Sequence, residues 1–288
     1  MVGNLIKAEW FRIIHGKSFY IMILIGFIYI FSQVTSITDM IINSLAIEVE
    51  EFEFDWIEMG VDEKFILELE ALEGMERLPI YGYLAFRHSN VDAIMMFFTP
   101  FLIVSLFASE YNKKTIYALI SLVENRINIF WGKYIVLFTM IFILHSFFAL
   151  TSTISATLLN GWGNDMILIP VANILMLVFK MTFYQMALGG LTFVLSFIIR
   201  HDSVVILSHF VASIIESIVA SIVISFRSSN VVFNFLHNLL PTVYSHTFLG
   251  RIGHRYVGMN ISAWISILLV ILMSVLISLM MFKRQDLV

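Results

Sequence analysis

The chain has 288 residues, of which 59% are hydrophobic and only 13% are charged, and its mean hydropathy is +0.91. Soluble domains carry roughly a quarter charged residues, so a soluble chain of this composition could not cover its surface. The solvent is therefore expected to be lipid. The net charge of −4 gives no reason to expect a nucleic-acid partner, and the absence of cysteine excludes disulfides and thiolate chemistry.

An amphipathic segment, residues 1–17, comes first in the chain. Its apolar side chains, Trp10 among them, recur at helical spacing, whereas Glu9 and Arg12 fall largely on the rest of the helix surface. A helix with one apolar stripe and a Trp anchor is typical of the membrane interface. We therefore predict an interfacial helix, followed by a first transmembrane helix within residues 18–42.

Residues 43–90 are polar and strongly acidic. They contain twelve Asp and Glu residues against three basic residues. Within them, Phe65, Leu69 and Leu72 recur at helical spacing, which favours a helix with one buried face. We interpret this region as a small acidic extracellular domain built from helices.

The remaining apolar runs are each long enough to cross a bilayer as a helix. Five more spans are predicted, at residues 91–108, 131–154, 176–199, 203–226 and 261–282. The region 130–288 thus holds transmembrane helices three to six, with an outer loop at 227–259. The segments predicted inside carry ten of the 17 Lys and Arg residues and those predicted outside carry six, so both termini are expected in the cytoplasm.

The loop between the second and third spans, residues 109–129, contains another amphipathic pattern. Ile116, Leu119, Ile120 and Val123 form an apolar face at i, i+3, i+4 and i+7, and the charged residues fall mostly off that face. Such a helix could lie flat on the lipid, or it could fill a groove on a soluble partner. The pattern by itself leaves both interpretations open.

Polar side chains inside the predicted spans are the candidates for an intramembrane site. Glu216 falls in the middle of the fifth span, where an ionised carboxylate costs at least about 2.5–3.5 kcal/mol and should face protein or water. It could pair with Lys180 and fix helices four and five, or it could lie on a wetted substrate path. The residues considered for such a path are Lys180, His209, Ser213, Glu216 and Ser217.

Two further features of the spans have a structural interpretation. Serines spaced by four in the fifth and sixth spans permit close helix packing, and His145 in the third span is expected to be a hydrogen-bonded core histidine. The sequence contains no His-Glu-x-x-His pattern or other signature of an intramembrane enzyme. We therefore expect no catalytic, cofactor-binding or metal-binding residues in this chain.

The order of these elements resembles the permease subunits of ATP-binding-cassette exporters of the ABC-2 type. Those chains have an N-terminal interfacial helix, six spans, a coupling helix between spans two and three, and an outer helical segment before span six. Their loop motif has an acid, Gly-Thr, an apolar stretch, Ser-x-Pro, and Ser-Arg before an apolar residue and Lys. The matching residues here are Glu110, Thr115-Ile116, Leu119-Ile120-Ser121, Asn125-Arg126-Ile127 and Lys133, whereas Lys114 replaces the usual Gly and Val123 the usual Pro.

This resemblance implies an all-α polytopic membrane protein with six transmembrane helices, an N-terminal interfacial helix and a cytoplasmic coupling helix over 109–129. It implies that the coupling helix docks a separate ABC ATPase subunit. That subunit would bind ATP and Mg²⁺, and this chain would hold no cofactor. The residues that the resemblance assigns to ATPase docking are Glu110, Lys113, Lys114, Thr115, Ile116, Leu119, Ile120, Glu124 and Arg126.

The resemblance also implies an assembly and a cargo. A second permease copy, or a homologous permease, would complete the transporter in a bacterial plasma membrane. Exporters with this layout resemble those for amphipathic or antimicrobial peptides, including phenol-soluble-modulin and lantibiotic-immunity systems, so a peptide cargo is expected. Two alternatives stay open: a membrane receptor or immunity protein that works without an ATPase, and an ion-coupled transporter with Glu216 as its proton site.

Overall fold

The computed structural model describes residues 2–46, 91–112, 126–160, 171–199, 201–226 and 261–284. Every regular element in these ranges is a helix, so the all-helical class expected from the sequence is confirmed for this part of the chain. The elements are α1 (Val2–Ile14), α2 (Lys17–Ala46), α5 (Val91–Ile103), the π-helix η1 (Val104–Ala108), α6 (Ser109–Asn112), α8 (Arg126–Asn160), α9 (Val171–Leu188), α10 (Gly190–Ile198), α11 (Asp202–Phe226) and α14 (Ile261–Arg284).

Four helical segments are long and apolar enough to cross a membrane. They are Lys17–Ser36 in α2, Arg126–Ser155 in α8, Val178–Ile198 in α9 and α10, and Trp264–Arg284 in α14. These correspond to the predicted first, third, fourth and sixth spans, whereas the predicted second and fifth spans contain shorter apolar helices at Ile94–Ala108 and Asp202–Ile215. The chain is thus compatible with a membrane protein that has four candidate spans among its described residues.

Several predicted segments fall on parts of the chain that the structure does not describe. Nearly all of the predicted acidic domain and the whole outer loop at 227–259 lie outside the described residues. The same holds for residues 113–125, which carry most of the predicted coupling helix. The extracellular position of the acidic domain therefore stays a prediction. The position of α1 at a membrane interface also stays a prediction, because the helix is described without a membrane.

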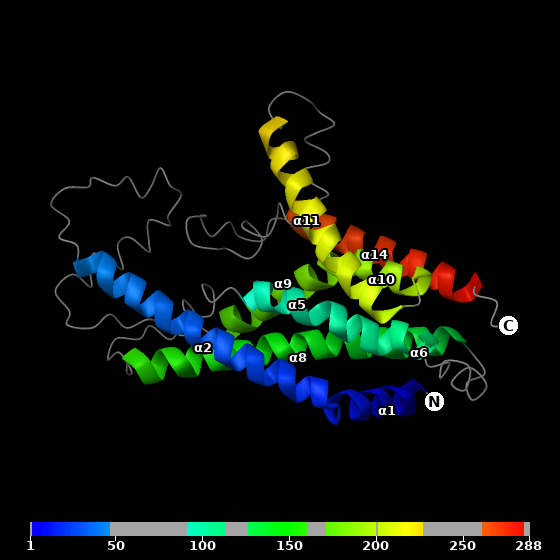
Figure 1. The fold of residues 1–288 in the computed structure, drawn as a ribbon, viewed down its shortest axis with the longest axis horizontal. Helices are drawn as coiled ribbons and strands as arrows, with labels where there is room; N and C mark the ends of the chain where they lie inside the picture. Colours follow the sequence, from blue (N-terminus) through cyan, green and yellow to red (C-terminus); the bar gives the residue numbers. More distant parts are fainter. Residues whose placement is uncertain are drawn as a thin grey trace.

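The long helix α8 forms the centre of the bundle. It packs against α1, α2, α5, α9 and α14. In Figure 1 it runs the length of the bundle, α2 crosses it obliquely, and α1 lies below it. Its apolar residues are distributed evenly around the helix, which is the pattern of a helix that is covered on several sides. Met140, Leu144 and Phe148, which are spaced by four, are fully buried.

The helices α10, α11 and α14 form a second group that packs on this centre. The closest partners of α10 are α14 and α11. Figure 1 shows that α11 leaves the bundle at a steep angle, so its far half stands away from the other described helices. On α14, Ser274 and Ser278 are buried, as the close packing predicted from their spacing requires.

Two glycines let neighbouring helices approach α8 closely. A Cβ at Gly26 of α2 would overlap the ring of Phe148, and one at Gly132 of α8 would lie 2.8 Å from Leu5 Cδ2 in α1. Small residues serve this purpose between helices in membranes, because they let the backbones come together. Phe148 is fully buried, so its ring has little room into which it could retreat.

Regular α-helix is interrupted at two places in the bundle. The helix α5 continues through Pro100 and then becomes the π-helix η1. The predicted fourth span, 176–199, is divided into α9 and α10 at Gly189. A Cβ at Gly189 would lie only 3.0 Å from Thr99 Cγ2 and 3.2 Å from the Gln185 carbonyl oxygen, so glycine permits the close approach of α5 to this junction.

The contact between α2 and α8 gives a first prediction. Gly26→Ala is expected to lower the free energy of unfolding by about 1–3 kcal/mol, because the added methyl group must displace the buried ring of Phe148. Thermal unfolding of the purified protein in detergent measures the effect. Gly3→Ala is the matched control, since nothing lies within 4 Å of a Cβ at Gly3. Equal melting temperatures for the two variants would contradict the close contact.

Candidate functional site

A buried charge cluster joins three separate parts of the chain. We define it by its four residues: Glu9 and Arg12 from α1, Glu110 from α6, and Lys133 from α8. The ammonium nitrogen of Lys133 lies 2.7 Å from Glu9 Oε1 and 2.6 Å from Glu110 Oε1. Arg12 lies 2.6 Å from Glu9 Oε2 through Nη2 and 2.6 Å from Glu110 Oε1 through Nη1. Two cations thus face two carboxylates in one connected network.

The hydrogen bonds of Lys133 are complete. An ammonium group has three donors, and the acceptors around Lys133 are the two carboxylates and the Leu106 carbonyl oxygen, which is 2.8 Å away. The side chain of Lys133 is only 2% exposed. A charge removed from water to this extent is tolerated only when it is paired and hydrogen-bonded, and the charge cluster meets both conditions.

The π-helix η1 supplies backbone acceptors for the charge cluster. At its end the Ser109 N–H donates to the Val104 carbonyl, five residues back, instead of to Ser105 as in an α-helix. The Ser105 carbonyl oxygen is therefore open to other donors, and it accepts from Arg12 Nη2 at 3.0 Å and from the Ser109 hydroxyl at 3.0 Å. Together with the Lys133 bond to Leu106, these contacts attach α1 and α8 to the irregular turn of η1.

Burial is the largest influence on the pKa of Glu110. Burial raises the pKa of its carboxyl above the ordinary value of 4.5; Lys133 opposes this shift, and the neighbouring Glu9 carboxylate adds to it. Its second oxygen, Oε2, has no hydrogen-bond partner among the described residues. The ion pairs of Glu110 therefore offset only part of the cost of removing it from water.

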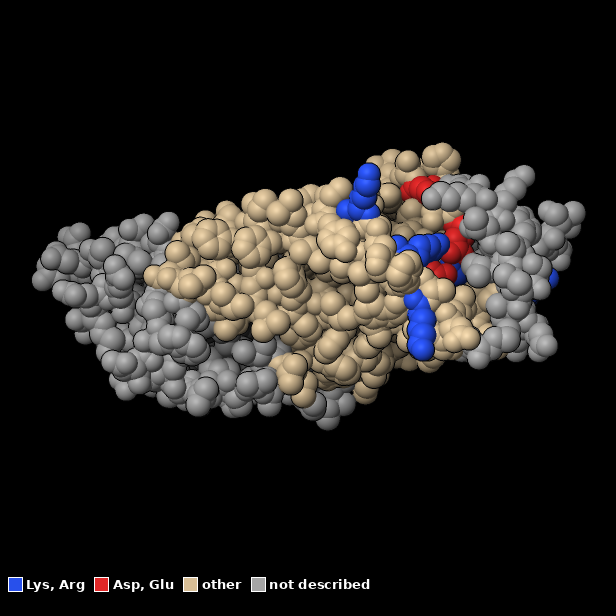
Figure 2. Space-filling view, turned by 90° about the horizontal axis from the view of Figure 1, so that it is seen from below, with Lys and Arg blue, Asp and Glu red and all other residues tan. Residues whose placement is uncertain are grey.

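The charge cluster lies at one end of the bundle. Figure 2 shows that, on the face it presents, the charged side chains of the described residues gather toward one end, beside a long uncharged surface. An aromatic group lies next to the cluster: Phe107, Phe130, Phe193, Phe197 and Phe282, with neighbouring ring centres 4.8–6.4 Å apart. The start of α8 and the ends of η1, α10 and α14 therefore meet at this end.

Of the residues assigned to ATPase docking, the structure describes two side chains. Glu110 is 2% exposed and its carboxylate faces Lys133 and Arg12 of its own chain. Arg126 is the first residue of α8 and is exposed. The other docking residues, from Lys113 to Glu124, lie outside the described residues. The docking role of the loop stays a prediction, but Glu110 is positioned as an internal anchor at its beginning.

The residues proposed for an intramembrane path are only partly brought together. His209 and Ser213 are both buried on α11. The ring nitrogen Nδ1 of His209 lies 2.6 Å from the Thr192 hydroxyl of α10. The Ser213 hydroxyl donates to the His209 carbonyl oxygen at 2.9 Å. Lys180 is buried on α9. The side chains of Glu216 and Ser217 lie outside the described residues, so the pairing of Glu216 with Lys180 stays a prediction.

One intramembrane expectation can be checked directly. His145 is fully buried in α8, and its Nδ1 lies 3.0 Å from the Ile141 carbonyl oxygen and 3.4 Å from the Thr182 hydroxyl of α9. The expectation of a hydrogen-bonded core histidine is thus confirmed. Across the described residues there is no group of three or more His, Asp or Glu side chains placed to hold a metal ion.

The pairing of Glu9 and Arg12 with Glu110 and Lys133 was not expected from the sequence. Glu9 and Arg12 were expected on the polar side of an interfacial helix, and Lys133 at the start of the third span. A usable signal was present, because Lys133 lies inside the otherwise uncharged, largely apolar run from Ile129 to Val136. A lysine in such a run requires an acidic partner, and Glu110 is the acid nearest to the end of the preceding span.

The charge cluster predicts unequal effects of removing its members. Lys133→Met should lower the free energy of unfolding by about 3–5 kcal/mol, because the buried Glu9 and Glu110 would keep only the partly exposed Arg12 as a counter-charge. Adding Glu9→Gln should restore part of this loss, since the remaining Arg12 then has to balance one buried carboxylate instead of two. Melting temperatures of the single and double variants measure both effects. Lys7→Met, on the exposed side of α1, is the control; a loss as large in the control would refute the assignment.

The raised pKa of Glu110 predicts a pH dependence with a definite sign. The folded state holds this proton more tightly than the unfolded chain, so the stability contributed by this carboxyl declines as the pH rises from 4.5 through the raised pKa. Glu110→Gln removes this decline. The melting temperature of the variant should therefore rise relative to that of the unmodified protein between pH 4.5 and pH 8. A constant difference over this range would show that Glu110 does not titrate in this way.

The charge cluster and its attachment to η1 are thus defined by distances within one chain, between residues far apart in the sequence. The chain matches no protein-family model and no curated protein.

Proposed function

We propose that this chain is the permease subunit of an ATP-driven exporter of the ABC-2 type. A separate ABC ATPase would bind ATP and Mg²⁺ and dock on the loop at 109–129. A second permease copy, or a homologous permease, would complete the transport path. This chain would carry out no covalent chemistry; its work would be to change conformation in response to the state of the ATPase.

The observation that carries this proposal is the charge cluster around Lys133. The loop leaves the described structure after Asn112 and re-enters it at Arg126. On one side of the loop Glu110 is held by Lys133, and Lys133 belongs to the helix on the other side. Both sides are also held by α1 through Glu9 and Arg12. A force applied to the loop by a soluble partner would therefore act on α1, α6 and α8 as one unit.

The central position of α8 supports transmission of such a force. Because α8 packs against α2, α5, α9 and α14, a displacement of its first turns would reach most of the described bundle. The start of α8 also carries Phe130, whose ring lies 5.9 Å from that of Phe282 in α14 and 6.0 Å from that of Phe197 in α10. A loop that merely rested on lipid would not need this rigid support on both of its sides.

The proposed cargo is an amphipathic or antimicrobial peptide that leaves the cell. The support comes from the family resemblance and from the contrast between the apolar spans and the acidic segment at 43–90. An acidic outer surface would attract a cationic peptide electrostatically, and apolar walls would accommodate its hydrophobic face.

Co-purification of an ATPase with this chain tests the proposal. The tagged chain, isolated from its host membrane in mild detergent, is expected to carry an ATPase whose hydrolysis rises when amphipathic peptides are added. Isolation without any ATPase, together with peptide binding, would favour the receptor alternative. Transport driven by a pH gradient in the absence of ATP would favour the ion-coupled alternative.

Two variants test the role of the loop. Glu110→Gln keeps the shape of the side chain but removes its charge, so the amount of peptide exported per ATP hydrolysed is expected to fall about 5-fold or more. Arg126→Gln, at the exposed end of the loop, is expected to reduce the amount of ATPase that co-purifies. Lys7→Gln on the exposed side of α1 is the control. Unchanged export in both loop variants would count against docking at 109–129.

A further inference from the structure

The polar face of α1 is turned outward, because the bundle covers its apolar face. Ile13 is buried, and Trp10 packs against the same apolar core. Arg12 and His15 are exposed on the outer face, and exposed Lys17 follows at the start of α2. Charged side chains are costly in hydrocarbon, so this face is expected to lie in the headgroup layer.

Two apolar windows show where that layer lies on each side of the bundle. The window in α2 is Lys17–Ser36, with 20 residues, and the window in α14 is Trp264–Arg284, with 21 residues. Each is about 30 Å long as a helix, which matches the hydrocarbon layer of a bilayer. Neither window has spare length, so its charged end marks the edge of the hydrocarbon. In Figure 1 the start of α2 lies below α8, and α14 lies above it.

The two edges lie at different heights along the bundle. The ring of Phe282, near the end of α14, lies 5.9 Å from that of Phe130 in α8. Phe148 lies about 27 Å further along α8, and Gly26 of α2 rests against its ring. Lys17 precedes Gly26 by only about 13 Å along α2. The edge of the hydrocarbon is therefore roughly 10 Å or more deeper at α2 than at α14.

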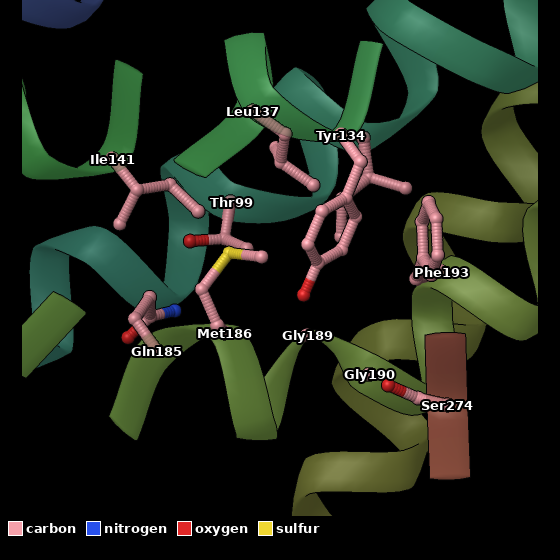
Figure 3. Close-up of a pocket in the computed structure, with 11 residues that line it drawn as sticks. Thr99, Tyr134, Leu137, Ile141, Gln185, Met186, Gly189, Gly190, Phe193 and Ser274 are labelled. Carbon is pink, nitrogen blue, oxygen red and sulfur yellow. The ribbon is translucent and has the colours of Figure 1, made fainter. Parts of the chain in front are cut away.

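The height reached by Lys17 falls within the apolar part of α14. Ser274 lies about 12 Å before Phe282 along α14, and the neighbouring Met273 is 55% exposed. Ser274 borders a small cavity together with Leu137 of α8, and the lining residues labelled in Figure 3 are all uncharged. The polar face of α1 thus lies level with an apolar interior and an apolar outer face on α14.

We propose that the outer surface at Arg12 and Lys17 is a docking surface for the headgroups of anionic phospholipids, at a height where α14 contacts hydrocarbon. Headgroups are the occupant because the apolar window of α2 begins at this surface. Tyr20, one turn further along α2, is 57% exposed and supplies the amphipathic ring that is enriched at headgroup level. This inference depends on the membrane character of the chain and not on the proposed transport function.

The charges exposed at this surface favour an anionic lipid over a neutral one. Glu9 and Glu110 are turned inward to Lys133, and their side chains are 5% exposed or less. The side chain of Arg12 is 42% exposed, and Lys17 is exposed as well. Since the charge cluster has equal numbers of cations and carboxylates, Lys17 makes the surface positive overall. Basic residues at the membrane surface attract anionic lipids.

The height difference is testable with single cysteines, because the chain has none of its own. Ser18→Cys, beside Lys17, and Met273→Cys, on the outer face of α14, each receive a nitroxide label; both residues are exposed. In nanodiscs the label at 273 is expected to be more accessible to oxygen, and the label at 18 to a water-soluble nickel chelate. Finding both labels in hydrocarbon would overturn the proposal.

The lipid class is testable with a bimane label on Ser18→Cys in nanodiscs of equal parts phosphatidylglycerol and phosphatidylcholine. Brominated phosphatidylglycerol is expected to quench bimane about 2-fold or more strongly than brominated phosphatidylcholine. Lys17→Gln should remove this difference, whereas Lys7→Gln, on the same face of α1, is the matched control and should keep it. In detergent, where no bilayer is present, Lys17→Gln should leave the melting temperature unchanged.

Three results of the quenching experiment would overturn the docking surface. Equal quenching by the two lipids would show no preference for the anionic headgroup. An unchanged preference in Lys17→Gln would place the attraction elsewhere on the chain. Loss of the preference in inorganic phosphate, but not in sodium chloride of equal ionic strength, would indicate a site for free anions instead of lipid.

Discussion

A lysine ammonium group buried between apolar helices is the constraint on which the described structure depends. Lys133 is placed by its own helix, α8, in an environment from which water is excluded. Its charge requires carboxylates, and its three protons require three acceptors. Glu9, Glu110 and the Leu106 carbonyl meet these needs, and they belong to elements before α8 in the chain. The positions of α1, η1 and α6 against α8 follow from this requirement.

The π-helix η1 is in direct contact with α10, the helix that follows the glycine junction. Phe107 of η1 lies 4.8 Å from Phe193 and 5.4 Å from Phe197 of α10, measured between ring centres. The π-helix adjoins the charge cluster, and α10 follows the glycine junction at Gly189. Single π-helical turns within α-helices are frequent at functional sites. A change at the charge cluster could thus pass through aromatic contacts to the junction between α9 and α10.

Composition and hydrophobic periodicity predicted the helical class well, because long apolar runs in this chain have few alternatives to helix. The end of α14 at Arg284 lies close to its predicted limit of 282, whereas α8 begins at Arg126, within the segment 109–129 that was predicted as the coupling helix. The division of the predicted span 176–199 at Gly189 was not foreseen, and neither was the close approach of Thr99 from another helix to this glycine. Local sequence contains no information about such a neighbour.

The candidate site shows the same limit of sequence reasoning. Glu9 and Arg12 are three residues apart and suggested only a polar helix surface. Their pairing with Glu110 and Lys133 joins residues up to 124 positions apart, so it follows from tertiary packing. By contrast, the role of His145 could be predicted, because a single histidine in an apolar helix usually bonds to the backbone of its own helix or to a neighbouring hydroxyl.

The four charged residues of the charge cluster do not share water equally. The side chain of Arg12 is 42% exposed, whereas those of Glu9, Glu110 and Lys133 are 5% exposed or less. Mobile electrolyte can therefore screen the guanidinium group but not the inner lysine. Concentrated salt would loosen the outer edge of α1 while leaving its inner attachment in place. Of the two cations in the charge cluster, only Arg12 is open to anionic headgroups, so lipid charge would act on the outer attachment of α1 and leave the inner one in place.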